Sequence, residues 1–213
     1  MHLPDGSLSV PIWVAGDVLA GCALALSARR ATGQLDDHRV VLMGVMGAFV
    51  FAAQMINFPL PGGTSGHMLG AVLLGVLLGP ALSTVIMFCV LLVQSLLFQD
   101  GGLTVLGPNL INMGLVGCWG GWALVHLATR GKVSAWRRDV AVFAACLLAV
   151  EAGALLTGLS LWASGNAPLG PVLMTMGGVH ALVGVVEGLV TVATLRFLWA
   201  ARPDLRAAWE GLS

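Results

Sequence analysis

The sequence predicts an all-α integral membrane protein, a polytopic bundle of about seven transmembrane helices. Of its 213 residues, 58% are hydrophobic and only 9% are charged, whereas a soluble domain carries about 25% charged residues. No Asp, Glu, Lys or Arg occurs between Arg39 and Asp100, and the apolar runs exceed the roughly 18 residues that cross a bilayer. Because a spanning segment must satisfy its own backbone hydrogen bonds, continuous runs favour helices over the alternating strands of a β-barrel.

Seven apolar segments are predicted to build this bundle as a single domain covering residues 1–213. In chain order they are Ser9 to Ala28, Val40 to Ile56, Met68 to Gly79, Ala81 to Phe98, Pro108 to Thr129, Val140 to Trp162 and Val172 to Ala200. The third segment is too short to cross alone, and Pro80 marks its turn into the fourth. We expect the third segment to begin inside the protein, because irregular backbone at membrane depth must be buried or line a cavity.

The ten basic residues predict the orientation of the chain. They are Arg29, Arg30, Arg39, Arg130, Lys132, Arg137, Arg138, Arg196, Arg202 and Arg206. With seven crossings all of them lie on one side, which the positive-inside rule makes cytoplasmic. This pattern predicts a multi-pass protein of the cell (inner) membrane, with the N-terminus and the loop around His67 outside and the C-terminus in the cytoplasm.

The first segment has a second interpretation as a secretory signal, because Ala23-Leu-Ala25 resembles a cleavage site. No Lys or Arg precedes it, however, and Arg29-Arg30 follow it directly in the manner of a stop-transfer anchor. We therefore expect the segment to be retained as a transmembrane helix.

Composition and motifs argue against several classes of function. The formal net charge is zero, which gives no indication of a nucleic-acid partner. The sequence contains no nucleotide-binding GxxxxGK[ST], metalloprotease HExxH or nucleophile GxSxG motif, so an enzyme is not predicted. Four isolated cysteines, without CxxC spacing, are expected to act as small hydrophobic residues. These are Cys22, Cys89, Cys118 and Cys146.

Two histidines in unusual surroundings indicate a metal site. In the opening Met1-His2-Leu-Pro-Asp-Gly, the Met1 amine, the deprotonated His2 amide and the His2 imidazole close one five-membered and one six-membered chelate ring. His67, at the end of a run that begins at Asn57, is a candidate for a fourth nitrogen, and Pro4 with the turn that follows it should bend the terminal peptide back into the bundle. Nitrogen ligands suit late first-row divalent ions. Each histidine alone is better explained as an ordinary polar residue; together on one face they favour a site.

Other polar residues are weaker candidates. Asn57, Thr64 and Ser65 are predicted to orient the imidazoles as outer-shell partners. Interhelical hydrogen bonding explains Gln54, Gln94, Asn109 and Asn112 equally well. Ionisable groups inside predicted spans are functional candidates by default, and these are Asp17, Glu151, His180 and Glu187. His180 and Glu187 are seven residues apart on one helix face, which favours a structural role.

The two motifs together resemble a known family. Met1-His2-Leu-Pro-Asp-Gly and Asn57-Phe-Pro-Leu-Pro-Gly-Gly-Thr-Ser-Gly-His67 are similar to the two signatures of the CbiM/NikM family, the cobalt and nickel substrate-binding (S) membrane subunits of energy-coupling factor (ECF) ABC transporters. The resemblance extends over essentially the whole chain. It implies a seven-helix protein whose metal ligands map onto Met1, His2 and His67.

The same resemblance implies the cargo and the partners. The cargo would be Co²⁺, or Ni²⁺, taken up from outside without a cofactor of the chain's own, and imported cobalt would feed cobalamin synthesis. The partners would be a CbiQ-type transmembrane coupling subunit, two cytoplasmic CbiO-type ATPases and a small CbiN-type accessory subunit.

Three alternatives to a cobalt-binding subunit remain open at this stage. Overall similarity to cobalt-type members favours cobalt, whereas the Irving–Williams order alone favours nickel or copper, so a nickel-specific subunit is an alternative. A second is an autonomous divalent-ion carrier that uses Asp17, Glu151 and Glu187 as its path, and a third is a membrane protein that binds metal without moving it. For a coupled subunit, small residues suit a docking face, and Gly16 with Ala20, or Gly44 with Ala48 and Ala52, supply them.

Overall fold

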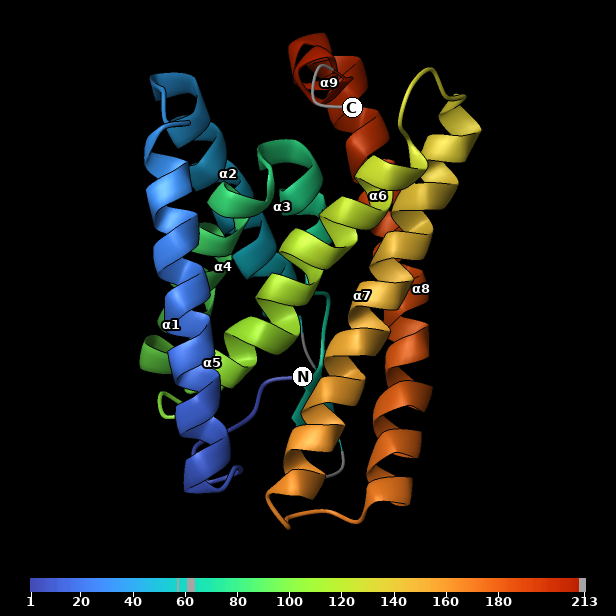
Figure 1. Cartoon of the computed structure of the whole chain (residues 1–213). Helices are drawn as coiled ribbons and strands as arrows, with labels where there is room; N and C mark the ends of the chain where they lie inside the picture. Colours follow the sequence, from blue (N-terminus) through green and yellow to red (C-terminus); the bar gives the residue numbers. More distant parts are fainter. Residues whose placement is uncertain (57, 61–63, 211–213) are drawn as a thin grey trace.

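Long helices run the length of the molecule, and the segments between them are short (Figure 1). The computed structural model describes residues 1–56, 58–60 and 64–210. Its elements are α1 (Val10–Thr32), α2 (Asp37–Gln54), β1 (Phe58–Leu60), β2 (Thr64–Gly66), α3 (Ala71–Leu78), α4 (Pro80–Leu97), α5 (Leu106–Asn109), the π-helical η1 (Leu110–Gly121), α6 (Trp122–Ala128), α7 (Ala135–Ala163), α8 (Leu169–Ala201) and α9 (Pro203–Glu210). The all-α class is confirmed, and the two three-residue strands form only a small hairpin.

Five helical stretches of the described chain are long and apolar enough to cross a membrane. They are α1, α4, the continuous α5–η1–α6, α7 and α8. Of the other two predicted segments, α2 begins with the polar residues Asp37-His38-Arg39 and α3 has eight residues. The chain is a multi-pass membrane protein, while the count of seven crossings stays a prediction.

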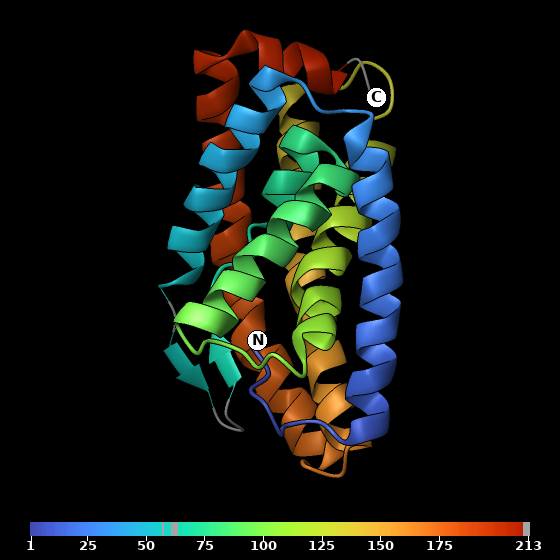
Figure 2. The same ribbon diagram turned by 90° about the vertical axis from the view of Figure 1, so that its left-hand side faces the viewer.

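The third predicted segment does begin inside the protein. Seven of the eight residues of α3 are buried, and this short helix packs against α4 and η1; in Figure 2 it is seen beside the start of α4. Gly70, which precedes α3, has φ 72°, and a side chain there would collide with Val50. A glycine is therefore required at the point where the loop turns into α3.

Local sequence explains where several helices begin. Asp36 caps α2 by accepting a hydrogen bond from the Arg39 N–H at 2.7 Å, and Ser134 caps α7 by accepting from the Arg137 N–H at 3.2 Å. Such side chains satisfy N–H groups that have no partner within the helix. Pro80 occupies the first position of α4, where its missing N–H costs nothing.

Two elements were not predicted from the sequence. The antiparallel hairpin pairs Phe58 with Gly66, where a loop was expected, and α9 follows the last apolar segment. Both are short and carry no long apolar run, so hydropathy does not detect them. All four cysteines are free thiols, in agreement with the sequence.

Glycines allow the inner helices to pack closely around the site. A side chain at Gly117 would collide with Ala71 of α3, and one at Gly153 of α7 would collide with the backbone of Asn112 in η1. Close approach of backbones is typical of helix packing in membranes. It brings η1, α3 and α7 together in the interior.

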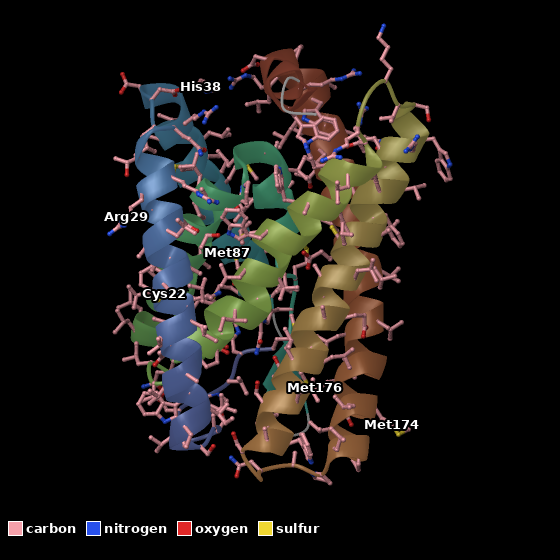
Figure 3. The ribbon with its side chains drawn as sticks, in the orientation of Figure 1. Cys22, Arg29, His38, Met87, Met174 and Met176 are labelled. Carbon is pink, nitrogen blue, oxygen red and sulfur yellow. The ribbon has the colours of Figure 1, made fainter. Side chains whose placement is uncertain are left out.

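The basic residues gather at one end of the molecule. The α1–α2 junction, the α6–α7 loop and α9 all lie at this end in Figure 1, and Figure 3 places Arg29 and His38 there. The N-terminal residue lies in the opposite half, between the helices. This separation agrees with the one-sided charge distribution that the sequence predicted; which end faces the cytoplasm stays a prediction.

Candidate metal centre

The N-terminal peptide enters the bundle and is held there by its backbone. Met1 and Leu3 are 0% exposed and His2 is 3% exposed. The Asn109 side chain accepts a hydrogen bond from the Leu3 N–H at 2.9 Å and donates one to the Leu3 carbonyl at 3.0 Å. The N–H of Gly102 donates to the same carbonyl at 2.8 Å. These contacts fix the position of the first three residues relative to α5 and the loop before it.

A turn directs the peptide inward, as the sequence predicted. Gly6 has φ 78°, and the Ser7 N–H donates to the Pro4 carbonyl at 3.2 Å. Asp5 accepts hydrogen bonds from the backbone N–H and the hydroxyl of Thr104, at 2.8 and 2.6 Å. These hydrogen bonds lower the pKa of the Asp5 carboxyl.

The three nitrogen-bearing residues named from the sequence converge. The Met1 amine lies 3.5 Å from Nε2 of His67, and the rings of His2 and His67 stack with centroids 4.5 Å apart and an interplanar angle of 29°. His67 is 2% exposed. Residues from the start of the chain and from the loop before α3 thus share one buried position.

The loop that carries His67 is held from two sides. The His67 Nδ1–H donates to the Met68 carbonyl at 2.7 Å, since a carbonyl oxygen only accepts. This leaves the lone pair of Nε2 directed toward the Met1 amine. Glu187 of α8 accepts from the Leu69 N–H at 2.5 Å and from the Gly70 N–H at 3.0 Å, which ties the segment after His67 to α8.

His2 has two polar neighbours on opposite ring nitrogens. Its Nε2 lies 3.1 Å from Oε1 of Gln94, and its Nδ1 lies 3.2 Å from Oδ1 of Asp100. Gln94 donates in turn to Gln54 at 3.0 Å, and Gln54 donates to the Leu69 carbonyl at 2.6 Å. Helices α2 and α4 therefore both support the imidazole of His2.

Burial keeps these nitrogens unprotonated. Desolvation lowers the pKa of the Met1 amine to about 5, against the raising effect of Asp100. It lowers the pKa of His2 to about 4 and the pKa of His67 well below its ordinary value. Deprotonated nitrogens are the form that binds a metal, so the site presents its ligand atoms without first having to release several protons.

The spacing fits a late transition ion. Metal–nitrogen bonds of about 2.0–2.1 Å place neighbouring ligand nitrogens roughly 3 Å apart and opposite ones about 4 Å apart, and the 3.5 Å between the Met1 amine and His67 Nε2 lies between these limits. Within the described residues, no three His, Cys, Asp or Glu side chains lie close enough together to hold an ion.

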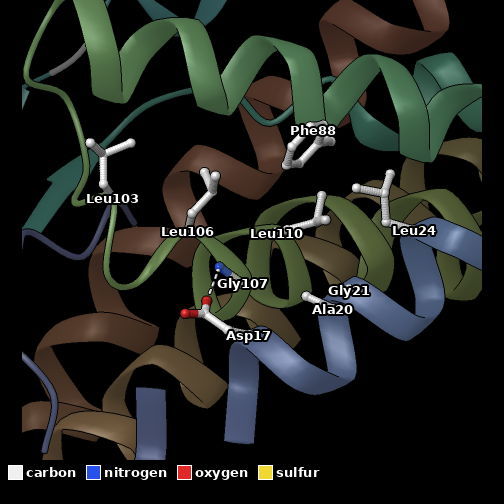
Figure 4. Close-up of a pocket in the computed structure, with 9 residues that line it drawn as sticks. All are labelled: Asp17, Ala20, Gly21, Leu24, Phe88, Leu103, Leu106, Gly107 and Leu110. Carbon is white, nitrogen blue, oxygen red and sulfur yellow. Dashed lines mark hydrogen bonds between the residues drawn. The ribbon is translucent and has the colours of Figure 1, made fainter. Parts of the chain in front are cut away.

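Several other residues named from the sequence take different places. Asn57 and the side chains of Thr64 and Ser65 lie outside the described part of the structure, so their outer-shell role stays a prediction. Asp17 accepts from the Gly107 N–H at 2.7 Å beside a small pocket between α1, α4 and α5 (Figure 4). Glu151 lies half-buried on α7.

The remaining polar residues support the interior rather than the first two residues directly. Asn112 donates to the Thr157 hydroxyl at 3.0 Å, linking η1 to α7. His180 and Glu187 are 0% and 1% exposed, so both lie on the inward face of α8, as their spacing predicted. Nδ1 of His180 donates to the Met176 carbonyl at 2.7 Å.

Sequence reasoning did not consider Asp100 beside His2. It named Asn109 and Glu187 as polar candidates but did not predict that Asn109 bonds to the backbone of Leu3 or that Glu187 bonds to the backbone after His67. A weak signal existed for Asp100, because it is the first charge after the long uncharged stretch. Asn109 and Glu187 contact residues more than 100 positions away, which no local pattern reveals.

Comparisons with known proteins find similarity over almost the whole chain. Residues 2–205 match a family model described as the cobalt uptake substrate-specific transmembrane region. A protein of Haloquadratum walsbyi, provisionally named a metal transport protein, is 39% identical over 96% of this chain and 93% of its own length. A fused nickel transport protein of Archaeoglobus fulgidus, also provisionally named, is 38% identical over 96% of this chain and 68% of its own length. A crystal structure described as a transition metal transporter superposes with a TM-score of 0.86 at 27% identity, over 94% of this chain and 93% of that one.

Proposed function

The chain belongs to the CbiM family of cobalt uptake transmembrane proteins, and on that premise we propose that it is the substrate-binding membrane subunit of an ECF-type ABC importer. It is a transport protein of a cobalt and nickel transport family and not an enzyme. In the proposed role it captures Co²⁺ or Ni²⁺ on the outer side of the membrane, and partner subunits hydrolyse ATP to deliver the ion to the cytoplasm.

One observation carries this proposal. The Met1 amine, His2 and His67 meet in a position that is at most 3% exposed. We assign the ion four nitrogens: the Met1 amine, the amide and Nδ1 of His2, and Nε2 of His67. Nitrogen donors favour late first-row ions over Mg²⁺ and Ca²⁺, which prefer oxygen.

We assign the cargo as Co²⁺, with Ni²⁺ as the alternative. The family description names cobalt, and a relative that is 38% identical is named for nickel. The proposed donor set serves both ions. Imported cobalt would supply cobalamin synthesis.

The proposed partners are those that membership of the family implies: a CbiQ-type coupling subunit, two CbiO-type ATPases and a CbiN-type accessory subunit. The sequence carries no nucleotide-binding motif, which is consistent with ATP hydrolysis by partners. Of the two small-residue faces, that of α1 packs internally, since Gly16 lies against Pro108 and Ala20 is 3% exposed. The face of α2 is exposed at Gly44, Ala48 and Ala52.

We therefore place the coupling contact on α2. Replacing Ala48 with Leu should weaken co-purification with the coupling subunit while leaving ion binding unchanged, because the position lies on the outer face of the bundle. Ala20→Leu is the contrasting variant and should impair folding. Unchanged assembly in Ala48→Leu would remove α2 from consideration.

The intramembrane acids favour this role over an autonomous carrier. Asp17 and Glu187 accept hydrogen bonds from backbone N–H groups of other elements, which are structural contacts. Together with Glu151 they belong to three different helices. In the proposed subunit Asp17 and Glu187 hold helices and loops in place.

The decisive experiment displaces one atom without changing any side chain. The chain is purified with Met1 as its first residue and again with two glycines before Met1, and bound Co²⁺ and Ni²⁺ are measured by equilibrium dialysis. The extension converts the amine to an amide and removes the first ligand, so binding should be lost; two glycines are used because a single one would place His2 third and create a new chelate with the added residue. A variant with two glycines added after Ser213 is the matched control and should bind normally. Equal binding by all three proteins would refute the proposed site.

A further inference from the structure

A chain of hydrogen bonds connects His2 to the main chain of the His67 loop. Gln54 Nε2 donates to the Leu69 carbonyl at 2.6 Å, Gln94 Nε2 donates to Gln54 Oε1 at 3.0 Å, and Gln94 Oε1 lies 3.1 Å from His2 Nε2. Both glutamines are 0% exposed. The chain crosses from the loop before α3 through the last residue of α2 and then α4 to the N-terminal peptide.

The direction of every bond in this chain is determined at the Leu69 end. A backbone carbonyl can only accept, so Gln54 must present its NH₂ group to Leu69 and its carbonyl oxygen to Gln94. Gln94 must then present its own NH₂ group to Gln54. Its carbonyl oxygen is left for His2, and an acceptor at that position requires an N–H on Nε2 of the imidazole.

A proton on Nε2 of His2 determines the state of the other ring nitrogen, Nδ1. A neutral imidazole carries one proton, so a proton held on Nε2 leaves the lone pair on Nδ1. Only Nδ1 closes the six-membered ring with the His2 amide, because it is the ring nitrogen nearer the main chain. We propose that Gln54 and Gln94 are positioning residues that keep the proton of His2 on Nε2 and assign Nδ1 to the ion; this role rests on the proposed function.

Asp100 fits the same assignment. Its Oδ1 lies 3.2 Å from His2 Nδ1, where a carboxylate and a bare lone pair would repel each other without a cation or a proton close by. When the ion occupies Nδ1, the carboxylate lies beside a positive charge. The chain of glutamines therefore directs toward Asp100 the nitrogen that offers its lone pair to the metal.

The backbone carbonyls of two consecutive residues, Met68 and Leu69, determine which ring nitrogen carries the proton in each histidine. His67 donates from Nδ1 to the Met68 carbonyl, which leaves Nε2 for the ion, and His2 is set through the two glutamines by the Leu69 carbonyl. Glu187 holds the N–H of Leu69. One short segment thus fixes which nitrogen each imidazole offers, and it offers a different one in each case.

The test measures the tautomer and the affinity separately. Protein labelled with ¹⁵N-histidine, free of metal at pH 8, should show the His2 proton on Nε2; the His2 signal is the one missing from His2→Ala. In Gln94→Met the acceptor is removed at similar side-chain volume, and the proton should move to Nδ1, where Asp100 accepts it. Affinity for Co²⁺ and Ni²⁺ should fall 10- to 100-fold, as is typical when an outer-shell partner of a ligating histidine is lost.

A second variant tests the chain rather than a single contact. Gln54→Met leaves the contact between Gln94 and His2 in place but frees the Gln94 amide to turn over, so it should shift the same ¹⁵N signals by a smaller amount. The double variant should behave like Gln94→Met alone, because residues that act through one chain are not additive.

The control removes an equally buried hydrogen bond elsewhere. Thr84 is 0% exposed and accepts from Trp119 Nε1 at 3.1 Å, so Thr84→Val should leave the His2 tautomer and the affinity unchanged. A wild-type protein that binds neither ion would overturn the proposed function together with this role. A protein that binds ions but carries the His2 proton on Nδ1, or whose affinity and ¹⁵N signals are unaffected by Gln94→Met, would overturn the role of the glutamines alone.

Discussion

The polar side chains that support the site are buried, whereas the opposite end of the molecule carries exposed ion pairs. Gln54 and Gln94, which support the site, are 0% exposed, whereas Arg202 and Asp204, which form an ion pair beside α9, are 47% and 54% exposed. The site residues bond to backbone groups of distant segments. At the opposite end, the Arg202 side chain donates to Asp204 two positions away and lies beside His38 of α2.

This difference indicates what each end can do. A buried amide or imidazole without a hydrogen-bond partner is costly, so each one at the site end has a fixed orientation, which is what a metal requires of its ligands. An exposed ion pair contributes little, because water already solvates both charges. The charged end is therefore suited to define orientation in the membrane, and the buried end is suited to bind.

The largest predicted effect comes from removing a ligand at the buried end. His67→Ala deletes Nε2, which lies 3.5 Å from the Met1 amine, and affinity for both ions should fall by more than the roughly 100-fold that loss of an outer-shell partner can cause. His126→Ala is the matched change far from the site, at a ring that stacks on Trp122, and should bind normally. Isothermal titration of both variants makes the comparison; similar affinities would show that the buried end is not the site.

The second largest predicted effect is on how the ion affinity depends on pH. The pKa of the Met1 amine is lowered from 8.0 to about 5 and that of His2 from 6.5 to about 4, so neither group takes up a proton between pH 8 and 6. In a free Met-His-Leu peptide the amine has a pKa of about 8 and does take up a proton over this range. At pH 6 only about 1% of the peptide amine is unprotonated and able to bind the ion. The affinity of the protein should therefore fall about 50-fold less than that of the peptide between pH 8 and 6, counting the amine alone. Parallel titration curves would contradict the burial of the amine.

The lowered pKa of the Met1 amine should also make the stability of the protein depend on pH. Between about pH 8 and pH 5 the unfolded chain binds a proton on its amine that the folded chain excludes, so the unfolded state is favoured as pH falls. The metal-free protein should become less stable over this window and change little from this group below it. Thermal unfolding in detergent at pH 8, 6.5 and 5 measures the trend.

A smaller effect is expected from the charge beside His2. The ion carries two positive charges, the deprotonated His2 amide offsets one and the Asp100 carboxylate offsets the other, so Asp100→Asn should lower affinity about tenfold by leaving a net charge in a buried position. Asp204→Asn is the same change at the exposed end and should have no effect on affinity. If both variants bound like wild type, Asp100 would have no part in balancing the charge.

The sequence predicted the helices and the meeting of the two histidines more fully than the support around them. Long apolar runs and an unusual pair of motifs are local signals, and α1, α4, α7 and α8 follow them closely. A buried glutamine such as Gln54 looks the same in sequence whether it joins two helices or sets a ligand. Its partners Leu69 and Gln94 lie 15 and 40 positions away, and only the packed bundle selects between these roles.

The smallest predicted effect tests the exposed end directly. Ser134 caps α7 through the Arg137 N–H at 3.2 Å, and Ser134→Ala should lower the free energy of unfolding by about 0.5–2 kcal/mol, as is usual for a lost N-cap. Ion affinity should stay the same, because α7 begins in the half of the molecule opposite Met1 (Figure 1). Denaturant unfolding and metal titration of one preparation give both values. A loss of affinity in Ser134→Ala would mean that the two ends are coupled through α7, and the division between a binding end and an orienting end would then no longer hold.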